Sequence, residues 1–119
     1  MKQKLSGIII DDDDDAVESL STFFDVKGHE VVGKGFTGCE AAALFEEKNP
    51  DFVILDMKMP KYDGNYAIKE IKKKNPNAKI FVITAYLENR NLKKEVTGVF
   101  LKPCNLTKLL ESIETSCYQ

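Results

Sequence analysis

The sequence predicts an α/β fold in which one five-stranded parallel sheet carries helices on both faces. Strand and helix signals alternate along the chain, and the connections between them are short. Four apolar, β-branched runs each end abruptly on a polar residue, which is typical of buried strands that stop at a sheet edge. Right-handed crossovers then give a doubly wound, three-layer α/β/α arrangement. We expect one domain over residues 1–119.

The first strand is predicted at residues 7–10, and a helix follows it. Asp15 is the expected N-cap of this helix, and Gly28 stands where the helix should end. Apolar residues recur at helical spacing between these two positions: Ala16, Val17, Leu20, Phe23 and Phe24.

A short second strand is predicted at residues 30–32, with Gly33 and Gly35 after it. The segment Thr37-Gly38-Cys39-Glu40 matches a capping box, which predicts the start of a second helix. Asn49-Pro50 stops that helix, because the residue before a proline disfavours helical geometry.

The third strand, at residues 52–55, is apolar without alternation, as expected for a strand covered on both faces. A helix from about residue 65 to residue 74 should follow it, and the fourth strand ends at Thr84. Residues 87–96 are polar and could form a short fourth helix. The last unit combines a strand at 99–101 with a helix that is capped by Asn105 and ends near residue 116.

Composition excludes several classes of function. The net charge of −2 gives no basic field for non-specific nucleic-acid binding. The apolar runs are far shorter than the roughly 20 residues of a membrane span, and no signal-peptide core follows Lys2 and Lys4. The three cysteines lack metal or redox spacing, so we expect reduced thiols in a cytoplasmic protein: Cys39, Cys104 and Cys117.

The polar residues at the strand ends form the candidate functional site. They are Asp11 and Asp12 after the first strand, Asp56 after the third, Thr84 at the fourth and Lys102 after the fifth. Parallel strands bring their carboxyl ends to one edge of the sheet, where open α/β sheets place their ligands. Carboxylates, a hydroxyl and an ammonium gathered there indicate a divalent metal and a phosphoryl group.

Each residue type has a chemical role in such a site. Close carboxylates ionise together at low cost only when a cation lies between them, and Mg²⁺ accepts one or two carboxylates together with water and phosphate oxygens. Asp56 is also a possible nucleophile that would form an acyl phosphate. Lys102 can pair with Asp56 at rest and with a phosphoryl oxygen afterwards, and the Thr84 hydroxyl can donate to another such oxygen.

The run of five aspartates at residues 11–15 has two other interpretations. It could be a solvated charge run, but its position directly after an isoleucine run favours the sheet edge. It also resembles the alternating start of an EF-hand loop. That loop needs Gly at its sixth position and Glu at its twelfth, where this chain has Ala16 and Thr22, so we reject a calcium loop.

The chain resembles the receiver domain of two-component response regulators, of the chemotaxis-regulator (CheY-like) type, over essentially its whole length. The resemblance rests on five segments, namely Ile8-Ile9-Ile10-Asp11-Asp12, Val53-Ile54-Leu55-Asp56-Met57-Lys58-Met59-Pro60, Asp63-Gly64, Val82-Ile83-Thr84-Ala85 and Leu101-Lys102-Pro103. It implies a flavodoxin-like (βα)5 fold and a phospho-acceptor function in signalling.

The resemblance also implies residue roles. Asp56 would take a phosphoryl group from a phosphohistidine on a sensor histidine kinase or a histidine phosphotransfer protein. Asp11 and Asp12 would hold Mg²⁺ or Mn²⁺, one of them through water, with the Met57 carbonyl as a further ligand. Thr84 and Lys102 would bind the phosphoryl oxygens, and a cis peptide before Pro103 would orient Lys102.

Two positions that tune hydrolysis in this family are Lys58 and Tyr86 here. Because both side chains are large, they would limit access of the attacking water, and we expect an aspartyl phosphate that is not especially short-lived. A hydrolysis rate well above that of the Lys58→Ala, Tyr86→Ala double variant would contradict this expectation.

The chain departs from the family pattern in three places. Val99 stands where receivers usually carry Tyr or Phe, and Phe100 should point to the other face of the sheet. The segment between Thr84 and Lys102 is about one helical turn shorter than usual. Asp13 and Asp14 add negative charge beside the site.

Two rival functions can be stated. A haloacid-dehalogenase-type phosphatase would use Asp11 and Asp13 with Thr84 and Lys102, but it leaves Asp56 without a role. A receiver-like interaction module would act without phosphorylation. We expect instead a cytoplasmic phospho-acceptor that signals to a downstream protein and is not a turnover enzyme. It should be a monomer or weak dimer, and it should bind neither nucleic acid nor membrane. It could stand alone or be excised from a longer regulator.

Overall fold

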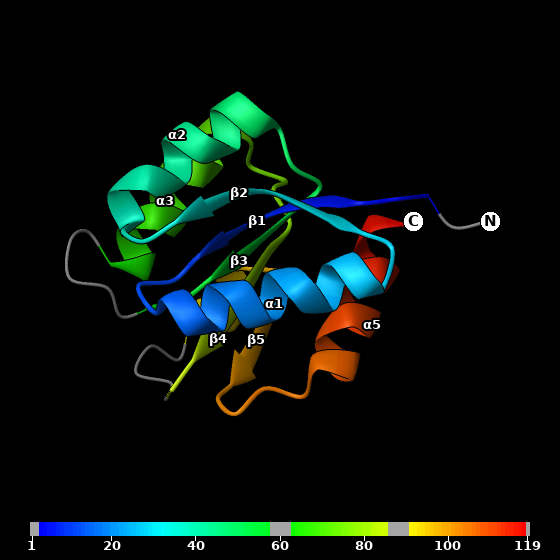
Figure 1. Cartoon of the computed structure of the whole chain (residues 1–119). Helices are drawn as coiled ribbons and strands as arrows, with labels where there is room; N and C mark the ends of the chain where they lie inside the picture. The colour runs from blue at the N-terminus through cyan, green and yellow to red at the C-terminus, as the bar shows by residue number, and fades with distance from the viewer. Residues whose placement is uncertain (1–2, 58–62, 86–90, 119) are drawn as a thin grey trace.

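A computed structural model describes residues 3–57, 63–85 and 91–118 of the chain. Five parallel strands form one sheet in the order β2-β1-β3-β4-β5 (Figure 1). The strands are β1 Ser6–Ile10, β2 Glu30–Gly35, β3 Phe52–Leu55, β4 Ile80–Thr84 and β5 Gly98–Leu101. The helices are α1 Asp14–Val26, α2 Gly38–Lys48, α3 Gly64–Lys74, α4 Leu92–Glu95 and α5 Leu106–Cys117. The predicted flavodoxin-like α/β fold is therefore confirmed.

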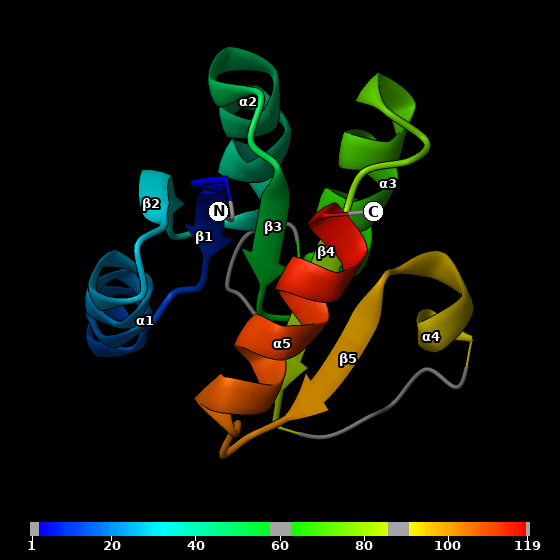
Figure 2. The same cartoon turned by 90° about the vertical axis from the view of Figure 1, so that its right-hand side faces the viewer.

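Each face of the sheet has its own apolar core. On one face, α1 and α5 pack on side chains such as Ile9, Ile54 and Phe81. On the other face, α2, α3 and α4 cover Ile8, Val53 and Val82, together with other strand residues (Figure 2). Neighbouring residues of a strand thus enter opposite cores, which explains why the apolar runs lack alternation.

Most predicted boundaries agree with the structure. β3 covers residues 52–55 and β4 ends at Thr84, as predicted. Asn105 caps α5, since its Oδ1 accepts a hydrogen bond from the Lys108 N–H at 3.1 Å. The α1 helix ends before Gly28, whose φ of +87° lies in the left-handed region that glycine adopts without strain.

The predicted N-cap of the first helix was wrong by two residues. Asp13, not Asp15, caps α1, because its Oδ1 accepts hydrogen bonds from the backbone N–H groups of Asp15 and Ala16 at 3.0 and 3.4 Å. An N-cap side chain satisfies the N–H groups two and three residues after it, and Asp15 already lies inside the first turn. Asp14 and Asp15 stay exposed in that turn, where the helix dipole favours negative charge.

The predicted second strand was too short. β2 continues to Gly35, and both glycines that were expected to follow it pair with β1, Gly33 with Ile8 and Gly35 with Ile10. The side chains of Ile10 and Leu44 occupy the space that a Gly35 side chain would need, since an added Cβ would lie 2.8 and 3.1 Å from them. Glycine is therefore used here for close packing.

Two helix starts differ in detail from the prediction. The α2 capping box is only partly formed: Glu40 accepts hydrogen bonds from the Phe36 N–H and the Thr37 hydroxyl, but the Thr37 side chain does not cap the backbone. The helix predicted within 87–96 is present as Leu92–Glu95 in the described part of that segment, and residues 86–90 lie outside the described residues.

Candidate functional site

Backbone hydrogen bonds extend the sheet by one residue beyond three of its strands and thereby fix the site. The N–H of Asp11 donates to the Gly35 carbonyl at 3.0 Å, and the N–H of Asp56 donates to the Ile10 carbonyl at 2.9 Å. The N–H of Lys102 donates to the Thr84 carbonyl at 2.8 Å. These three residues directly follow β1, β3 and β5, so they lie at the carboxyl edge of the sheet.

Three carboxylates converge at this edge. Asp11, Asp12 and Asp56 each offer an oxygen, and these oxygens lie within 4.8 Å of one another. Asp11 and Asp56 are buried, whereas Asp12 is exposed. A cluster with two buried carboxylates and one facing solvent suits a divalent cation that keeps part of its water shell.

Burial raises the pKa of the Asp11 carboxyl above its usual range, and the nearby Asp12 charge acts in the same direction. A hydrogen bond from the Asp13 N–H to Asp11 Oδ1, 3.0 Å long, and the Lys102 ammonium act against this rise. The ionised form of Asp11 is thus costly in the protein alone. A bound cation would remove much of that cost, so the residues present fit a metal ion.

Lys102 carries the positive charge of the site. Its Nζ lies 3.5 Å from Asp11 Oδ2 and 3.9 Å from Asp56 Oδ1, and its side chain is 36% exposed. These distances are long for hydrogen bonds but short enough for electrostatic attraction between the charges. The ammonium therefore sits beside both buried carboxylates and keeps room to move.

Thr84 and Pro103 flank this group. Thr84 is buried at the end of β4, where it pairs in register with Leu101 of β5. The Lys102–Pro103 peptide bond is cis, as the family resemblance implied. The sequence thus predicted correctly that Asp11, Asp12, Asp56 and Lys102 converge, and that Thr84 ends the strand next to Asp56.

Met57 links the site to α3. Its carbonyl accepts a hydrogen bond from the Gly64 N–H at 3.0 Å, and a carbonyl oxygen keeps a second lone pair for another partner. Asp63 caps α3, since its Oδ1 accepts from the N–H groups of Asn65 and Tyr66. The start of α3 is therefore fixed to the segment that carries Asp56.

A small hollow of about 270 Å³ lies beside the carboxylates, between α1 and the start of α5. Asp11, Asp56 and Lys102 line it together with Ser19 and Cys104. The α1 side of this hollow was not predicted from the sequence. The spacing of Ala16, Ser19 and Leu20 on one helical face could have indicated it.

Comparison with known proteins identifies the family. The family model of the response regulator receiver domain matches residues 8–114, which include every element of this site. The chain belongs to the response regulator receiver family. Receiver domains act in two-component signalling, where they interact with histidine kinases and downstream targets, and generally are not turnover enzymes. No helix in the described residues is long and apolar enough to cross a bilayer.

Individual relatives place the chain among receivers of different lengths. It is 33% identical over 110 residues to the chemotaxis protein CheY of Thermotoga maritima, covering 89% of this chain and 92% of that protein. It is 39% identical over 87 residues to the uncharacterized transcriptional regulatory protein YhcZ of Bacillus subtilis, covering 71% of this chain but only 41% of that protein. The CheY in a CheX–CheY–BeF3–Mg²⁺ complex from Borrelia burgdorferi is 27% identical, with a TM-score of 0.84 and coverage of 93% and 87%.

Val99 stands at the position where the family resemblance led us to expect an aromatic residue. Val99 packs into the core under α2, α3 and α4, whereas Phe100 packs into the core under α1 and α5. The prediction that Phe100 points to the other face is confirmed. Lys58 and Tyr86, the two positions predicted to tune hydrolysis, lie outside the described residues.

Proposed function

We propose that this receiver is a phospho-acceptor that takes a phosphoryl group from a phosphohistidine onto Asp56. The observation that carries the proposal is the convergence of the Asp11, Asp12 and Asp56 carboxylates, with the Lys102 ammonium within 4 Å of oxygens of Asp11 and Asp56. Such a group combines a nucleophile, acidic metal ligands and a cation that can neutralise a phosphoryl oxygen.

In this mechanism an oxygen of the Asp56 carboxylate attacks the donor phosphorus. The P–N bond to the donor imidazole breaks, and the imidazole leaves with the electron pair. Lys102 turns its ammonium from the Asp56 carboxylate to a new phosphoryl oxygen, a movement that its 3.9 Å separation from Asp56 Oδ1 allows. The Thr84 hydroxyl donates to another of these oxygens.

Asp11, Asp12, Asp56 and the Met57 carbonyl would hold the metal ion, for which we propose Mg²⁺ or Mn²⁺. When bound, the ion supplies positive charge beside the carboxylates and phosphoryl oxygens. The similar CheY of B. burgdorferi occurs in a complex that contains BeF3 and Mg²⁺, which supports magnesium as the first ion to test. Asp11 and Asp12 remain alternatives for the ligand that acts through water.

The proposed partners are a sensor histidine kinase or a histidine phosphotransfer protein as donor, and a downstream protein as target. We propose a cytoplasmic protein that does not turn over an external substrate. The phosphatase alternative would need Asp13 as a second catalytic acid, but the Asp13 side chain caps α1 and accepts two backbone hydrogen bonds. Because the Asp13 carboxylate is already engaged as a helix cap, the structure favours the receiver function over the phosphatase function.

Intact-mass spectrometry after incubation with acetyl phosphate and MgCl2 tests the proposal. We expect one phosphoryl adduct on the wild-type chain, and none on Asp56→Asn or in excess EDTA. Asp14→Asn is a matched control, since it removes an exposed carboxylate of the same acidic run and should accept phosphate normally. An adduct on Asp56→Asn would contradict the site assignment, and no adduct on the wild type would favour a phosphorylation-independent module.

A further inference from the structure

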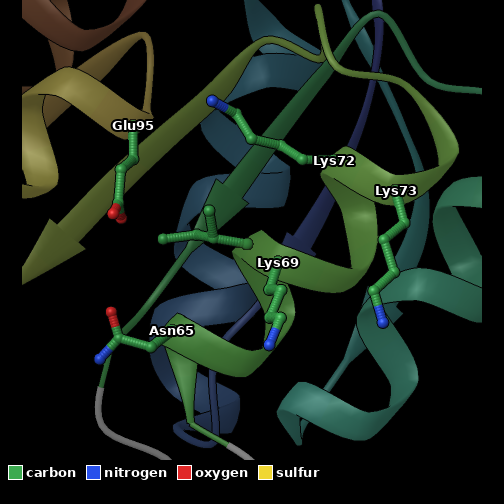
Figure 3. Close-up of a pocket in the computed structure, with 6 residues that line it drawn as sticks. Asn65, Lys69, Lys72, Lys73 and Glu95 are labelled. Carbon is green, nitrogen blue, oxygen red and sulfur yellow. The ribbon is translucent and has the colours of Figure 1, made fainter.

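A groove lies between α3 and α4, away from the carboxylate cluster. Its main part has a volume of about 530 Å³ and is lined by Asn65, Ile68, Lys69, Lys72, Lys73 and Glu95. Figure 3 shows that the labelled lysines and Asn65 project from α3, whereas Glu95 projects from α4 on the opposite wall. We call this feature the α3–α4 groove.

A second hollow of about 290 Å³ extends the α3–α4 groove, because both hollows share Lys72 and Glu95. Lys79 and Lys94 line this extension. The whole groove thus carries five lysines and, among its described lining residues, a single carboxylate, although the chain as a whole has a net charge of −2. Positive charge is therefore concentrated on this part of the surface.

Helical spacing explains why the lysines gather along one side. Lys69 follows Asn65 by four residues of α3, and Lys72 and Lys73 follow Lys69 by three and four residues, so the four side chains share one side of the helix beside the buried Ile68. The methylene stems of lysines cover apolar surface while their ammonium groups stay in water. The groove consequently combines an apolar floor with a charged rim.

Ion pairing within the chain already shows which groups these lysines attract. Lys73 pairs with Glu70 at 2.8 Å, and Lys74, next to it on α3, pairs with Glu46 of α2 at 2.7 Å. Within the described parts of the chain, Lys69 and Lys72 have no ion pair. These two ammonium groups remain available to carboxylates of another molecule.

We propose that the α3–α4 groove binds an acidic, amphipathic segment of a partner protein, with apolar side chains over Ile68 and carboxylates at Lys69 and Lys72. Charge complementarity identifies the occupant, and the apolar floor selects a peptide over a polyphosphate chain. The lining also contains lysines and no arginine among its described residues, whereas phosphate recognition favours the bidentate arginine fork. An amphipathic helix laid in a groove is a common way to bind such a segment.

Fluorescence anisotropy with a designed probe tests this proposal. The probe is a labelled peptide of about 12 residues, comparable in length to α3, with Leu and Glu recurring at three- and four-residue spacing. We expect saturable binding to the wild-type chain below about 1 mM that weakens with salt. Replacing the peptide's Glu by Gln, or its Leu by Ser, should each weaken binding.

Charge-reversal variants locate the binding site. Lys69→Glu with Lys72→Glu should weaken binding about tenfold or more, because two attractions become repulsions. Lys4→Glu with Lys108→Glu is the matched control: both residues are exposed outside the groove, the change in net charge is the same, and binding should weaken much less. The neutral pair Lys69→Gln with Lys72→Gln gives an intermediate loss and serves if charge reversal prevents folding.

Three outcomes would overturn the proposal. These are no saturable binding of the acidic peptide, equal weakening in the groove and control variants, and tighter binding of a single-stranded oligonucleotide of similar length with the same lysine dependence. Asp56→Asn should bind the peptide like the wild type. Failure of phosphorylation and failure of peptide binding are thereby separate results.

Discussion

Nε2 of His29 lies 2.8 Å from Oε2 of Glu114, although the two residues are 85 positions apart in the sequence. Nδ1 of His29 accepts a hydrogen bond from the Leu5 N–H at 3.1 Å, so the ring proton belongs on Nε2, which donates to Glu114. The imidazole is buried and joins the segment before β1, the start of β2 and α5. It therefore connects elements at the edge of the sheet opposite the carboxylate cluster.

Removing this connection should destabilise the fold. Glu114→Ala leaves a buried imidazole N–H without its acceptor, which costs about 1–3 kcal/mol in the free energy of unfolding. Glu114→Gln keeps an acceptor oxygen and should lose less. Urea unfolding measures both, with Glu111→Ala, an exposed residue of the same helix, as the control. A double-mutant cycle with His29→Ala that gives no coupling energy would show that the contact contributes nothing.

Gly64 is required at the start of α3 by the space beside Asp56. An added Cβ would lie 2.5 Å from Met57 Sδ, 2.7 Å from Met57 Cα and 3.0 Å from the Asp56 carbonyl oxygen. Gly64→Ala should therefore displace the backbone that carries Asp56, lower stability by about 1–3 kcal/mol and slow phosphorylation by acetyl phosphate. Asn65→Ala, one residue on and exposed, is the control. Phosphorylation at the wild-type rate in Gly64→Ala would mean that the segment tolerates the displacement.

The sequence predicted the strand ends well but could not distinguish identical neighbours. β3 and β4 were predicted well because continuous apolar runs stop on a polar residue. Among five consecutive aspartates, by contrast, only geometry decides that Asp13 caps α1 while Asp11 turns into the site. A pattern of residue types carries no information on that choice.

Contacts between distant residues were predicted only where a general rule of the fold brings the residues together. Asp11, Asp56 and Lys102 were found because parallel strands bring their ends together by a general rule. No such rule joins His29 to Glu114, since a single histidine forms no motif. The extension of β2 over Gly33 and Gly35 was missed for a related reason: glycine is depleted in strands, and here the packing of Ile8, Ile10 and Leu44 outweighs that preference.

Removing the Lys102 ammonium should strengthen metal binding and weaken signalling. Its ammonium lies within 4 Å of oxygens of Asp11 and Asp56, so it repels a divalent cation bound to the same carboxylates. Lys102→Ala should raise the affinity for Mg²⁺ by about threefold or more in isothermal titration calorimetry. The variant should still accept a phosphoryl group but give a weaker downstream response. Lys108→Ala is the matched control, and an unchanged or lower Mg²⁺ affinity in Lys102→Ala would contradict this electrostatic account.

Asp11 should make the metal-free protein less stable as the pH rises. Burial raises its pKa in the folded state, so its contribution to stability is fully present below the ordinary aspartate pKa and is lost as the pH rises through the higher folded value. Asp11→Asn removes the charge that causes this loss. In EDTA at pH 7 we therefore expect Asp11→Asn to melt on the order of 3 °C above the wild type, with the difference shrinking toward pH 3.

Added MgCl2 should stabilise the wild type and not the variant, because ligand binding to the folded state raises stability by mass action. Thermal unfolding followed by circular dichroism measures all of these differences. Asp15→Asn, exposed in the first turn of α1, is the control, and an Asp11→Asn variant that melts below the wild type at neutral pH would show that the lost Asp13 and Lys102 contacts outweigh the cost of burying the charge.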